Sequence, residues 1–397
     1  MVKPPTSLEQ SPLADFVALY ALLYCGFGVA SPFLPALLHE RGVPAETIGV
    51  LFAAGTAVRL LSAPIVGTIA DHTHALRLTL ALCAIATAFA ATGYAAAAGA
   101  FWPLLVVSLL HASAVAPTTN LADALASVAS RRQKPLGFEY GWVRGAGSAA
   151  FIVGSTIAGL AIGRLGMSVI IWLQVLLLLA VPFAVMGVPA IRARSGSDLV
   201  SRGDIMALLR VAAFRRIVLV AALIMGSHAL HDTFSVIRWK DAGISPQTIS
   251  ILWSLSVAAE VLVFFVVGPW LLRRLTPAMA IALAALAGAV RWFVAACTID
   301  IAASSLIQLL HGITFALLHL ACMRLLTQAV PDALAATAQA LYGTVGVGVA
   351  TALLTVASGW LYARVGAAAF AAMGALCLAA LPLTRSLAAA RTLQEHP

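Results

Sequence analysis

Residues 173–188 read LQVLLLLAVPFAVMGV, and residues 278–296 read AMAIALAALAGAVRWFVAA. Each run is close to the length of about 20 apolar residues that a helix needs to cross the hydrocarbon layer of a membrane. Neither run shows the alternating pattern of a membrane β-barrel, and a helix satisfies its backbone hydrogen bonds within one segment. Both runs therefore predict membrane-spanning α-helices.

The whole chain of 397 residues has the same apolar character. Hydrophobic residues make up 62% of it and charged residues 10%, and the mean hydropathy is +1.00. A soluble domain carries about 25% charged residues, so the composition excludes an ordinary soluble enzyme. The net charge of +9 does not indicate nucleic-acid binding, because the basic residues gather in short loops between apolar runs.

The apolar runs predict an all-α membrane protein of twelve helices in two six-helix bundles. The expected spans are 14–38, 46–70, 76–98, 101–127, 138–163, 167–189, 215–238, 246–270, 276–298, 302–327, 335–361 and 364–386. The longest polar break, at 190–214, divides the spans six and six. We therefore expect a first bundle at 1–189, a cytoplasmic linker at 190–214 with a short helix near 204–209, and a second bundle at 215–397.

Lysine and arginine placement predicts the orientation. With both termini cytoplasmic, fifteen basic residues fall in cytoplasmic segments and four, Arg41, Arg164, Lys240 and Arg364, fall outside. This asymmetry follows the positive-inside rule and indicates a multi-pass protein of a bacterial inner membrane. The first apolar run is interpreted as a span rather than a removable signal. The five cysteines lie in apolar runs without CxxC spacing, so neither a disulfide framework nor a metal site is expected, and no cofactor.

The two halves of the chain resemble each other at an offset of 200 to 202 residues. RGVPAETIGVLFAAG at 41–55 matches AGISPQTISILWSLS at 242–256, and LLH recurs at 109–111 and 309–311. Gly67 matches Gly268 in the same register. His111 and His311 are thus repeat partners, and we expect both to be donors in helix packing. Parallel repeats related by an axis along the membrane normal are the architecture of major facilitator transporters, whose substrate site lies at the midplane.

Several motifs resemble those of one transporter family. Gly67-Thr-Ile-Ala-Asp71 with Arg77 is similar to the major facilitator loop signature, without its second glycine and basic pair. HERGVPAETIGVLFAAG, EYGWVRGAGSAAFIVGS, WSLSVAAEVLVFF and LHGITFALLHLACMR look like the 3-phenylpropionate permease group. That group is related to oligosaccharide–proton and nucleoside–proton symporters. The resemblance spans about residues 14–385 and implies a monomeric transporter whose partners are a small-molecule substrate, protons and the lipid bilayer.

Charged side chains at membrane depth are costly and mark function. Burial disfavours the charged form of a carboxyl group, so Glu260 is a candidate to carry a proton; the alternative is a structural ion pair with Arg291 or Arg59. The resemblance implies a proton-coupling cluster in which Glu260, Arg291 and His319 match the positions of the oligosaccharide symporters. Those symporters have a second glutamate three residues after the histidine, where this chain has Cys322.

His228, His231 and Asp232 have spacings that place them on one helix face. We expect a polar cavity lining in which Asp232 is a second proton carrier. An ion pair between Asp232 and Arg324 or Arg238 is the alternative. A metal-dependent intramembrane enzyme would use the same three residues, but no HExxH or GxSxG motif accompanies them.

In the first half, Asn120 and Asp123 share a helix face and Arg144 lies in the next span. The carboxylate with the arginine resembles the sugar-binding pair of the oligosaccharide symporters. Arg144 is expected to bind an anionic group of the substrate through bidentate contacts; the alternative is a gate ion pair with Asp123.

Aromatic side chains are candidates to contact a ring in the substrate. A separate set of charged residues and one glycine is expected at the gates or in structural roles. Trp253 shares a helix face with Glu260, and packing or a place at the lipid interface is the alternative for it. The candidate ring contacts are Tyr24, Phe27 and Trp253. The candidate gate or structural residues are Arg59, Gly67, Asp71, Arg77 and Arg324.

The sequence thus predicts a proton-coupled importer of a small organic molecule, an aromatic carboxylate such as 3-phenylpropionate, that works by alternating access. A nucleoside or sugar symporter and a drug or metabolite exporter of the same fold are the alternatives. No enzyme activity is expected.

Overall fold

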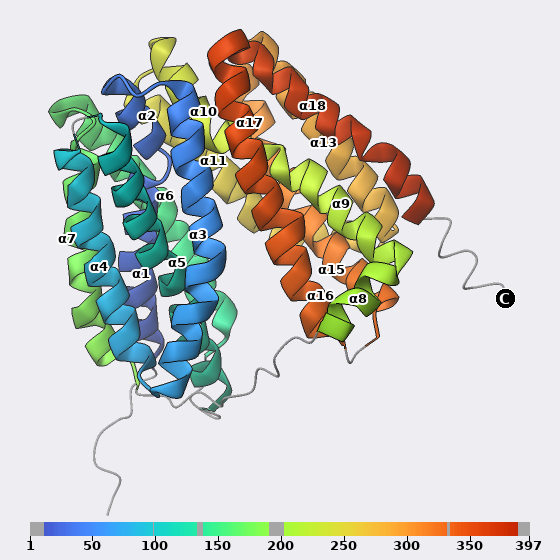
Figure 1. Cartoon of the computed structure of the whole chain (residues 1–397), viewed down its shortest axis with the longest axis horizontal. Helices are drawn as coiled ribbons and strands as arrows, with labels where there is room; N and C mark the ends of the chain where they lie inside the picture. The colour runs from blue at the N-terminus through green and yellow to red at the C-terminus, as the bar shows by residue number, and fades with distance from the viewer. Residues whose placement is uncertain (1–11, 98, 133–137, 190–201, 332–333, 388–397) are drawn as a thin grey trace, which may run out of the picture.

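The computed structural model describes residues 12–97, 99–132, 138–189, 202–331 and 334–387. These ranges are helical and contain no strand (Figure 1). The helices of the first half are α1 Leu13–Ala30, α2 Leu34–Glu40, α3 Ala45–His72, α4 Leu76–Ala96, α5 Phe101–Arg132, α6 Tyr140–Leu165 and α7 Val169–Gly187. Those of the second half begin with α8 Arg202–Arg210, α9 Ala212–Gly226, α10 His228–Asp241, α11 Pro246–Leu262, η1 Val263–Val267, α12 Gly268–Leu272 and α13 Pro277–Cys297. They continue with α14 Ile301–Leu309, η2 Ile313–Leu317, α15 Leu318–Ala329, α16 Ala335–Leu341, η4 Tyr342–Val349, α17 Ala350–Val365, η5 Gly366–Ala368 and α18 Ala369–Ala379.

The described residues contain eleven helical stretches that are long and apolar enough to cross a membrane. The last stretch, Ala335–Leu387, has 53 residues, far more than one crossing requires. It turns at Gly366, whose φ is +55°, directly after α17 ends at Val365, and α18 begins at Ala369. It therefore supplies two crossings, which brings the number to the twelve expected. The short helix expected near 204–209 is α8, whereas 190–201 of the expected linker lie outside the described residues.

The internal repeat is visible in the turns. Gly42 and Gly243 have φ of +80° and +78°, and Gly166 has φ of +82° at a helix end like that of Gly366. A left-handed backbone favours glycine because a side chain would clash there. The offsets within these pairs are those of the sequence repeat, so the two halves turn in the same way at equivalent positions.

The halves form two bundles that meet at one end and diverge toward the other (Figure 1). The end where they meet, which we call the closed end, contains 39–50, 159–163, 240–250 and 355–366. One hydrophobic cluster there joins Val29, Phe33 and Leu51 of the first half to the core of the second. At the divergent end, a separate cluster that includes Phe16 and Leu125 contains residues of the first half alone.

Small residues allow the backbones of the two halves to touch at the closed end. A Cβ atom added to Gly49 would lie 2.9 Å from the Cα of Gly359, and one added to Gly159 would lie 2.6 Å from Oγ of Ser250. Two ion pairs across the same boundary join α2 to α10. Lys240 Nζ lies 2.5 Å from Glu40 Oε2, and His39 Nε2 lies 3.4 Å from Asp241 Oδ2.

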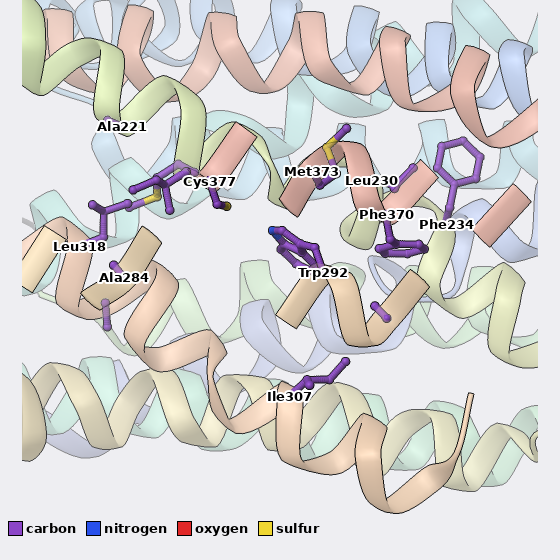
Figure 2. Close-up of a cluster of buried hydrophobic side chains, with 14 of the residues drawn as sticks. Ala221, Leu230, Phe234, Ala284, Trp292, Ile307, Leu318, Phe370, Met373 and Cys377 are labelled. Atoms are coloured by element: carbon purple, nitrogen blue, oxygen red, sulfur yellow. The ribbon is translucent and has the colours of Figure 1, made fainter. Parts of the chain in front are cut away.

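The core of the second half surrounds Trp292 on α13 (Figure 2). The indole is fully buried, and its Nε1 donates to Ser227 Oγ at 2.8 Å. Phe370 of α18 packs against it with 6.2 Å between ring centroids. This bond fixes α13 against the junction between α9 and α10, which is where the polar residues of the second half begin.

The glycine contacts predict how the closed end can be opened. Gly359→Ala adds a Cβ atom 2.7 Å from the carbonyl oxygen of Ala45, which forces α3 and α17 apart. We expect the population to shift toward a state closed at the divergent end, so spin labels at Thr73 and Arg274 should move closer in a cysteine-free background.

Gly343→Ala is the matched control, because Gly343 faces open space. Equal distance distributions for both variants would contradict the assigned role of the glycine contact.

Candidate functional site

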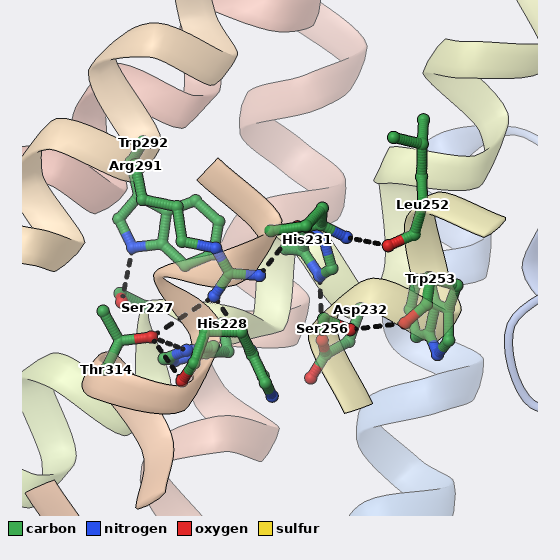
Figure 3. A network of polar contacts seen from close by, with 12 residues as sticks. Ser227, His228, His231, Asp232, Leu252, Trp253, Ser256, Arg291, Trp292 and Thr314 are labelled. Atoms are coloured by element: carbon green, nitrogen blue, oxygen red, sulfur yellow. Dashed lines mark hydrogen bonds and ion pairs between the residues drawn. The ribbon is translucent and has the colours of Figure 1, made fainter. Parts of the chain in front are cut away.

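The centre of the polar site in the second half is Arg291 on α13, whose side chain is fully buried (Figure 3). Its Nη2 donates to Gln308 Oε1 at 3.0 Å, and its Nη1 contacts His311 Nδ1 at 3.0 Å and Thr314 Oγ1 at 3.3 Å. The guanidinium also lies 4.4 Å from the ring centroid of Trp292. These three acceptors are uncharged, so they accept from Nη1 and Nη2 without neutralising the charge of Arg291, while its buried Nε has no hydrogen-bond partner among the described residues.

Glu260 on α11 is connected to Arg291 through His311. The carboxylate Oε2 of Glu260 lies 3.5 Å from His311 Nε2, and its side chain is 29% exposed. Arginine only donates hydrogen bonds, so Nδ1 of His311 accepts and the proton of the neutral ring sits on Nε2. Nε2 is the nitrogen that lies 3.5 Å from the Glu260 carboxylate. The opposite charges of Glu260 and Arg291 are therefore bridged by an imidazole with an assigned tautomer.

His311 and not His319 occupies this bridging position. The ring of His319 lies between Phe264 and Tyr342, with centroid distances of 6.0 and 5.8 Å, although it remains within electrostatic reach of Glu260. The expectation that His311 is a helix-packing donor is therefore incomplete. Its sequence signal was the repeated LLH, which indicates the internal repeat and carries no information about its neighbours.

His228, His231 and Asp232 lie together at the start of α10, as their spacing predicts. His228 Nδ1 donates to the carbonyl of Ile224 at 3.0 Å, and its Nε2 lies 3.0 Å from Thr314 Oγ1. His231 Nε2 lies 3.1 Å from Gln308 Oε1, and its Nδ1 lies 3.2 Å from Asp232 Oδ1. The side chain of Asp232 is 53% exposed, whereas that of His231 is 5% exposed.

The partners of Arg238 and Arg324 test whether either arginine forms an ion pair with Asp232. Arg238 donates to the carbonyl of Thr298 at 3.0 Å, and Arg324 donates to the carbonyl of Leu272. Among the described residues, the ion pair of Asp232 is with His231, so pairing with either arginine is wrong. Within the same residues, no group of three His, Cys, Asp or Glu side chains is arranged to hold a metal ion.

In the first half, Arg144 on α6 contacts Tyr24 on α1. Its Nη1 donates to the Tyr24 hydroxyl, and the guanidinium lies 4.9 Å from the centroid of the same ring. Asp123 on α5 instead accepts a hydrogen bond from the hydroxyl of Tyr20. The ion pairs within 4 Å among the described residues do not include Arg144 with Asp123, so the gate ion pair is not formed in this structure. Arg144 therefore keeps donors available, and both Asp123 of its own half and Glu260 of the other half are within its electrostatic reach.

Aromatic rings lie beside Arg144 in the first half and beside the His231–Asp232 pair in the second half. Tyr20 and Tyr24 stack with centroids 5.6 Å apart, and Phe27 meets Tyr24 edge-on at 5.4 Å. Trp253 of the second half stacks on His231 at 5.2 Å. Trp253 is placed by its spacing on the same helix face as Glu260, and in the structure its ring contacts His231. Asn120 on α5 is exposed.

The expected gate residues are dispersed. Arg77 caps the end of α7, donating to the carbonyls of Val185 and Met186 at 3.0 and 2.8 Å; a cation at a helix C-terminus is favourable. Gly67 faces open space and Asp71 is half-buried. Arg59 lines a small pocket with other residues of the first half and is not paired with Glu260. The pocket neighbours include Tyr94, Ser108 and His111.

Comparison with known proteins identifies the family. The model described as the MFS_1 like family matches residues 13–372. The chain belongs to this family. A protein of Escherichia coli (strain K12) described as a "Probable 3-phenylpropionic acid transporter" is 31% identical over 363 residues, covering 91% of this chain and 94% of that protein.

Solved structures agree with the family. The nucleoside transporter NupG has a TM-score of 0.81 at 16% identity, with 96% of this chain and 99% of that chain covered. The D-xylose-proton symporter has a TM-score of 0.68 at 16% identity, with 94% and 96% covered. At these identities the likeness shows the fold alone. This MFS_1-like chain is therefore a multi-pass membrane transporter of the major facilitator fold and not an enzyme, as the sequence motifs predict.

The burial of Arg291 predicts a large stability effect. Arg291→Gln should lower the stability by about 3 kcal/mol, because it leaves Glu260 without a compensating charge and several buried acceptors without donors. Thermal denaturation of the detergent-solubilised protein measures this as a fall in Tm.

Arg364→Gln, the same change on an exposed helix end, should leave Tm within error. An equal Tm for the Arg291 variant and the wild type would show that the buried guanidinium does not organise the site.

Proposed function

We propose that this transporter imports a small aromatic carboxylate together with a proton. The observation that carries the proposal is Arg144, a cation that contacts a tyrosine hydroxyl and ring, has no carboxylate within 4 Å among the described residues, and lies within electrostatic reach of Glu260 in the opposite half. An arginine with available donors suits a carboxylate, which it binds with two parallel hydrogen bonds.

The neighbours of Arg144 favour an aromatic substrate. Tyr24 lies against the guanidinium and Phe27 meets the Tyr24 ring edge-on, and offset or edge-on ring pairs contribute beyond simple area burial. The name of the Escherichia coli relative supports the same substrate class. Arg291 is a poor anion site by comparison, because it is fully buried and its donors contact Gln308, His311 and Thr314.

Electrostatics gives a physical link between proton and substrate. An ionised Glu260 within reach of Arg144 repels a second carboxylate there, since like charges destabilise each other strongly at low dielectric. Protonation of Glu260 removes the repulsion and favours binding of the anion. By reciprocity, the bound anion strengthens proton binding by the same factor. The proton and the substrate therefore enter the site together.

We infer from the charge distribution that the divergent end faces the cytoplasm across a bacterial inner membrane. Among the described residues, that end carries Arg77, Arg210, Arg215, Arg216, Arg273 and Arg274, whereas the closed end carries Arg41, Arg164, Lys240 and Arg364, which supports this orientation under the positive-inside rule. The structure then corresponds to an inward-facing state in which the closed end seals the outer side, and both termini are cytoplasmic.

Glu260→Gln tests the coupling, because glutamine mimics the protonated side chain. We expect proteoliposomes to lose accumulation of 3-phenylpropionate driven by a proton gradient, while exchange of labelled for unlabelled substrate continues. Glu46→Gln, at the start of α3, is the control and should accumulate normally. Undiminished accumulation by Glu260→Gln would reject the role of this carboxylate.

Arg144→Gln tests the anion site. The binding of 3-phenylpropionate should weaken about tenfold or more, because a hydrogen bond to a charged group contributes about 1.5–3 kcal/mol. The thermal shift of the purified protein measures this, since stabilisation depends on ligand concentration relative to Kd. The neutral alcohol 3-phenylpropanol should bind both proteins equally weakly. Stabilisation by nucleosides or disaccharides, with none by aromatic acids, would reject the proposed substrate class.

A further inference from the structure

We infer that His231 and Asp232 together form a second proton-binding site, distinct from Glu260, and that Gln308 is the positioning residue that makes it one. The role of this site in transport rests on the proposed function, whereas its occupancy by a proton follows from hydrogen-bond donors and acceptors alone.

The orientation of Gln308 is determined on both sides of its amide. Its Nε2 donates to the carbonyl oxygen of Leu252 at 3.2 Å, and a carbonyl can only accept. Its Oε1 receives Nη2 of Arg291 at 3.0 Å, and a guanidinium can only donate. The reversed amide would place donors against donors at Arg291. The oxygen of Gln308 therefore faces the cluster.

This orientation assigns the tautomer of His231. Nε2 of His231 lies 3.1 Å from the oxygen of Gln308, which has no hydrogen to donate. Nε2 must therefore carry a hydrogen and donate it. In a neutral imidazole the other nitrogen, Nδ1, then has only a lone pair.

The lone pair of Nδ1 faces the carboxyl oxygen Oδ1 of Asp232 at 3.2 Å. Two acceptors cannot form a hydrogen bond, so a hydrogen-bonded pair at this distance requires one further proton. It lies either on the carboxyl group, which then donates to Nδ1, or on the imidazole, which then donates to an ionised Asp232. Both arrangements hold one proton more than a neutral histidine beside a carboxylate.

The charges around the pair agree with this count. The titratable groups that face Asp232 are His228 on its own helix, Glu260 on α11, Arg291 on α13 and His311 between α14 and η2. Arg291 and Glu260 balance each other through His311. The protonated pair is neutral in total, so the whole cluster carries no net charge at membrane depth, where a net charge is costly. Loss of the proton leaves one unbalanced negative charge.

The pair is also accessible to a proton. The side chain of Asp232 is 53% exposed while the imidazole of His231 is 5% exposed, and the ring is held by Trp253 stacked 5.2 Å away. One partner is thus fixed by packing and the other has a half-exposed side chain, which suits reversible proton exchange.

The test counts protons on the purified full-length protein in detergent by acid–base titration from alkaline to mildly acidic pH. Asp232→Asn should take up one proton fewer per chain than the wild type, because the asparagine amide donates to Nδ1 and needs no added proton. Asp300→Asn is the matched control. Asp300 caps α14 by accepting from the backbone N–H of Ala303 at 2.8 Å, and asparagine caps equally well, so its proton count should match the wild type. Equal counts for Asp232→Asn and the wild type would overturn the inference.

Two substitutions of Gln308 test its positioning role and remain informative if Asp232→Asn fails to fold. Gln308→Met releases Nε2, so His231 can donate from Nδ1 to an ionised Asp232, and the pair should lose its proton at a lower pH than the wild type. Gln308→Glu retains the acceptor and adds a negative charge, so the proton should be retained to a higher pH. Each shift should be about one pH unit or more. A purely structural role predicts no opposite shifts, and shifts in the same direction would overturn the assignment.

Transport assays separate this inference from the proposed function. If Asp232→Asn takes up one proton fewer than the wild type while Glu260→Gln still accumulates substrate, the second site stands and the proposed role of Glu260 fails. If Glu260→Gln abolishes accumulation and the proton count of Asp232→Asn is unchanged, the proposed function stands and the second site is rejected.

Discussion

A guanidinium group without contact to water organises the second half of this transporter. Arg291 cannot lose its proton, so every one of its neighbours must accept hydrogen bonds or compensate its charge. Gln308, His311 and Thr314 meet the first requirement, and Glu260 meets the second through His311. Each acceptor then has its remaining hydrogen-bonding groups assigned in turn. In this way one buried cation determines the tautomer of His311, which it contacts directly, and that of His231, which it reaches through Gln308.

The two halves share a fold and use their charges differently. Arg291 is enclosed by acceptors of its own bundle, whereas Arg144 of the first half contacts a tyrosine and keeps donors available. Arg59, which precedes Glu260 by 201 residues and so matches it in the internal repeat, lines a small pocket in the first bundle. A repeat conserves helix directions and turns, because these follow from backbone geometry. It does not conserve polar side chains, because each bundle has to satisfy its own buried groups.

The sequence predicts the fold well because the membrane restricts what an apolar run can become. Hydropathy gives the spans, and the offset of 200 to 202 residues predicts the paired turns at Gly42 and Gly243. The site is predicted less well. His319 was expected beside Glu260, but eight residues along a helix correspond to about 12 Å, so His311 and His319 cannot occupy the same position. Gln308 gave no signal, because a neutral amide in an apolar run resembles any packed polar residue until its partners are known.

The contacts that close one end of the molecule are suited to being broken. The ion pairs of Lys240 with Glu40 and of His39 with Asp241 are partly exposed, and exposed pairs contribute about 0–1 kcal/mol each. Glycine contacts such as Gly49 with Gly359 bring the backbones together, and the hydrophobic cluster that joins the halves adds apolar burial at the same end. The ion pairs therefore contribute only a small part of the free energy that holds this end closed. One uncompensated charge at membrane depth costs more than these exposed pairs contribute, so in the proposed mechanism protonation in the polar cluster shifts the balance between the state closed at one end and the state closed at the other.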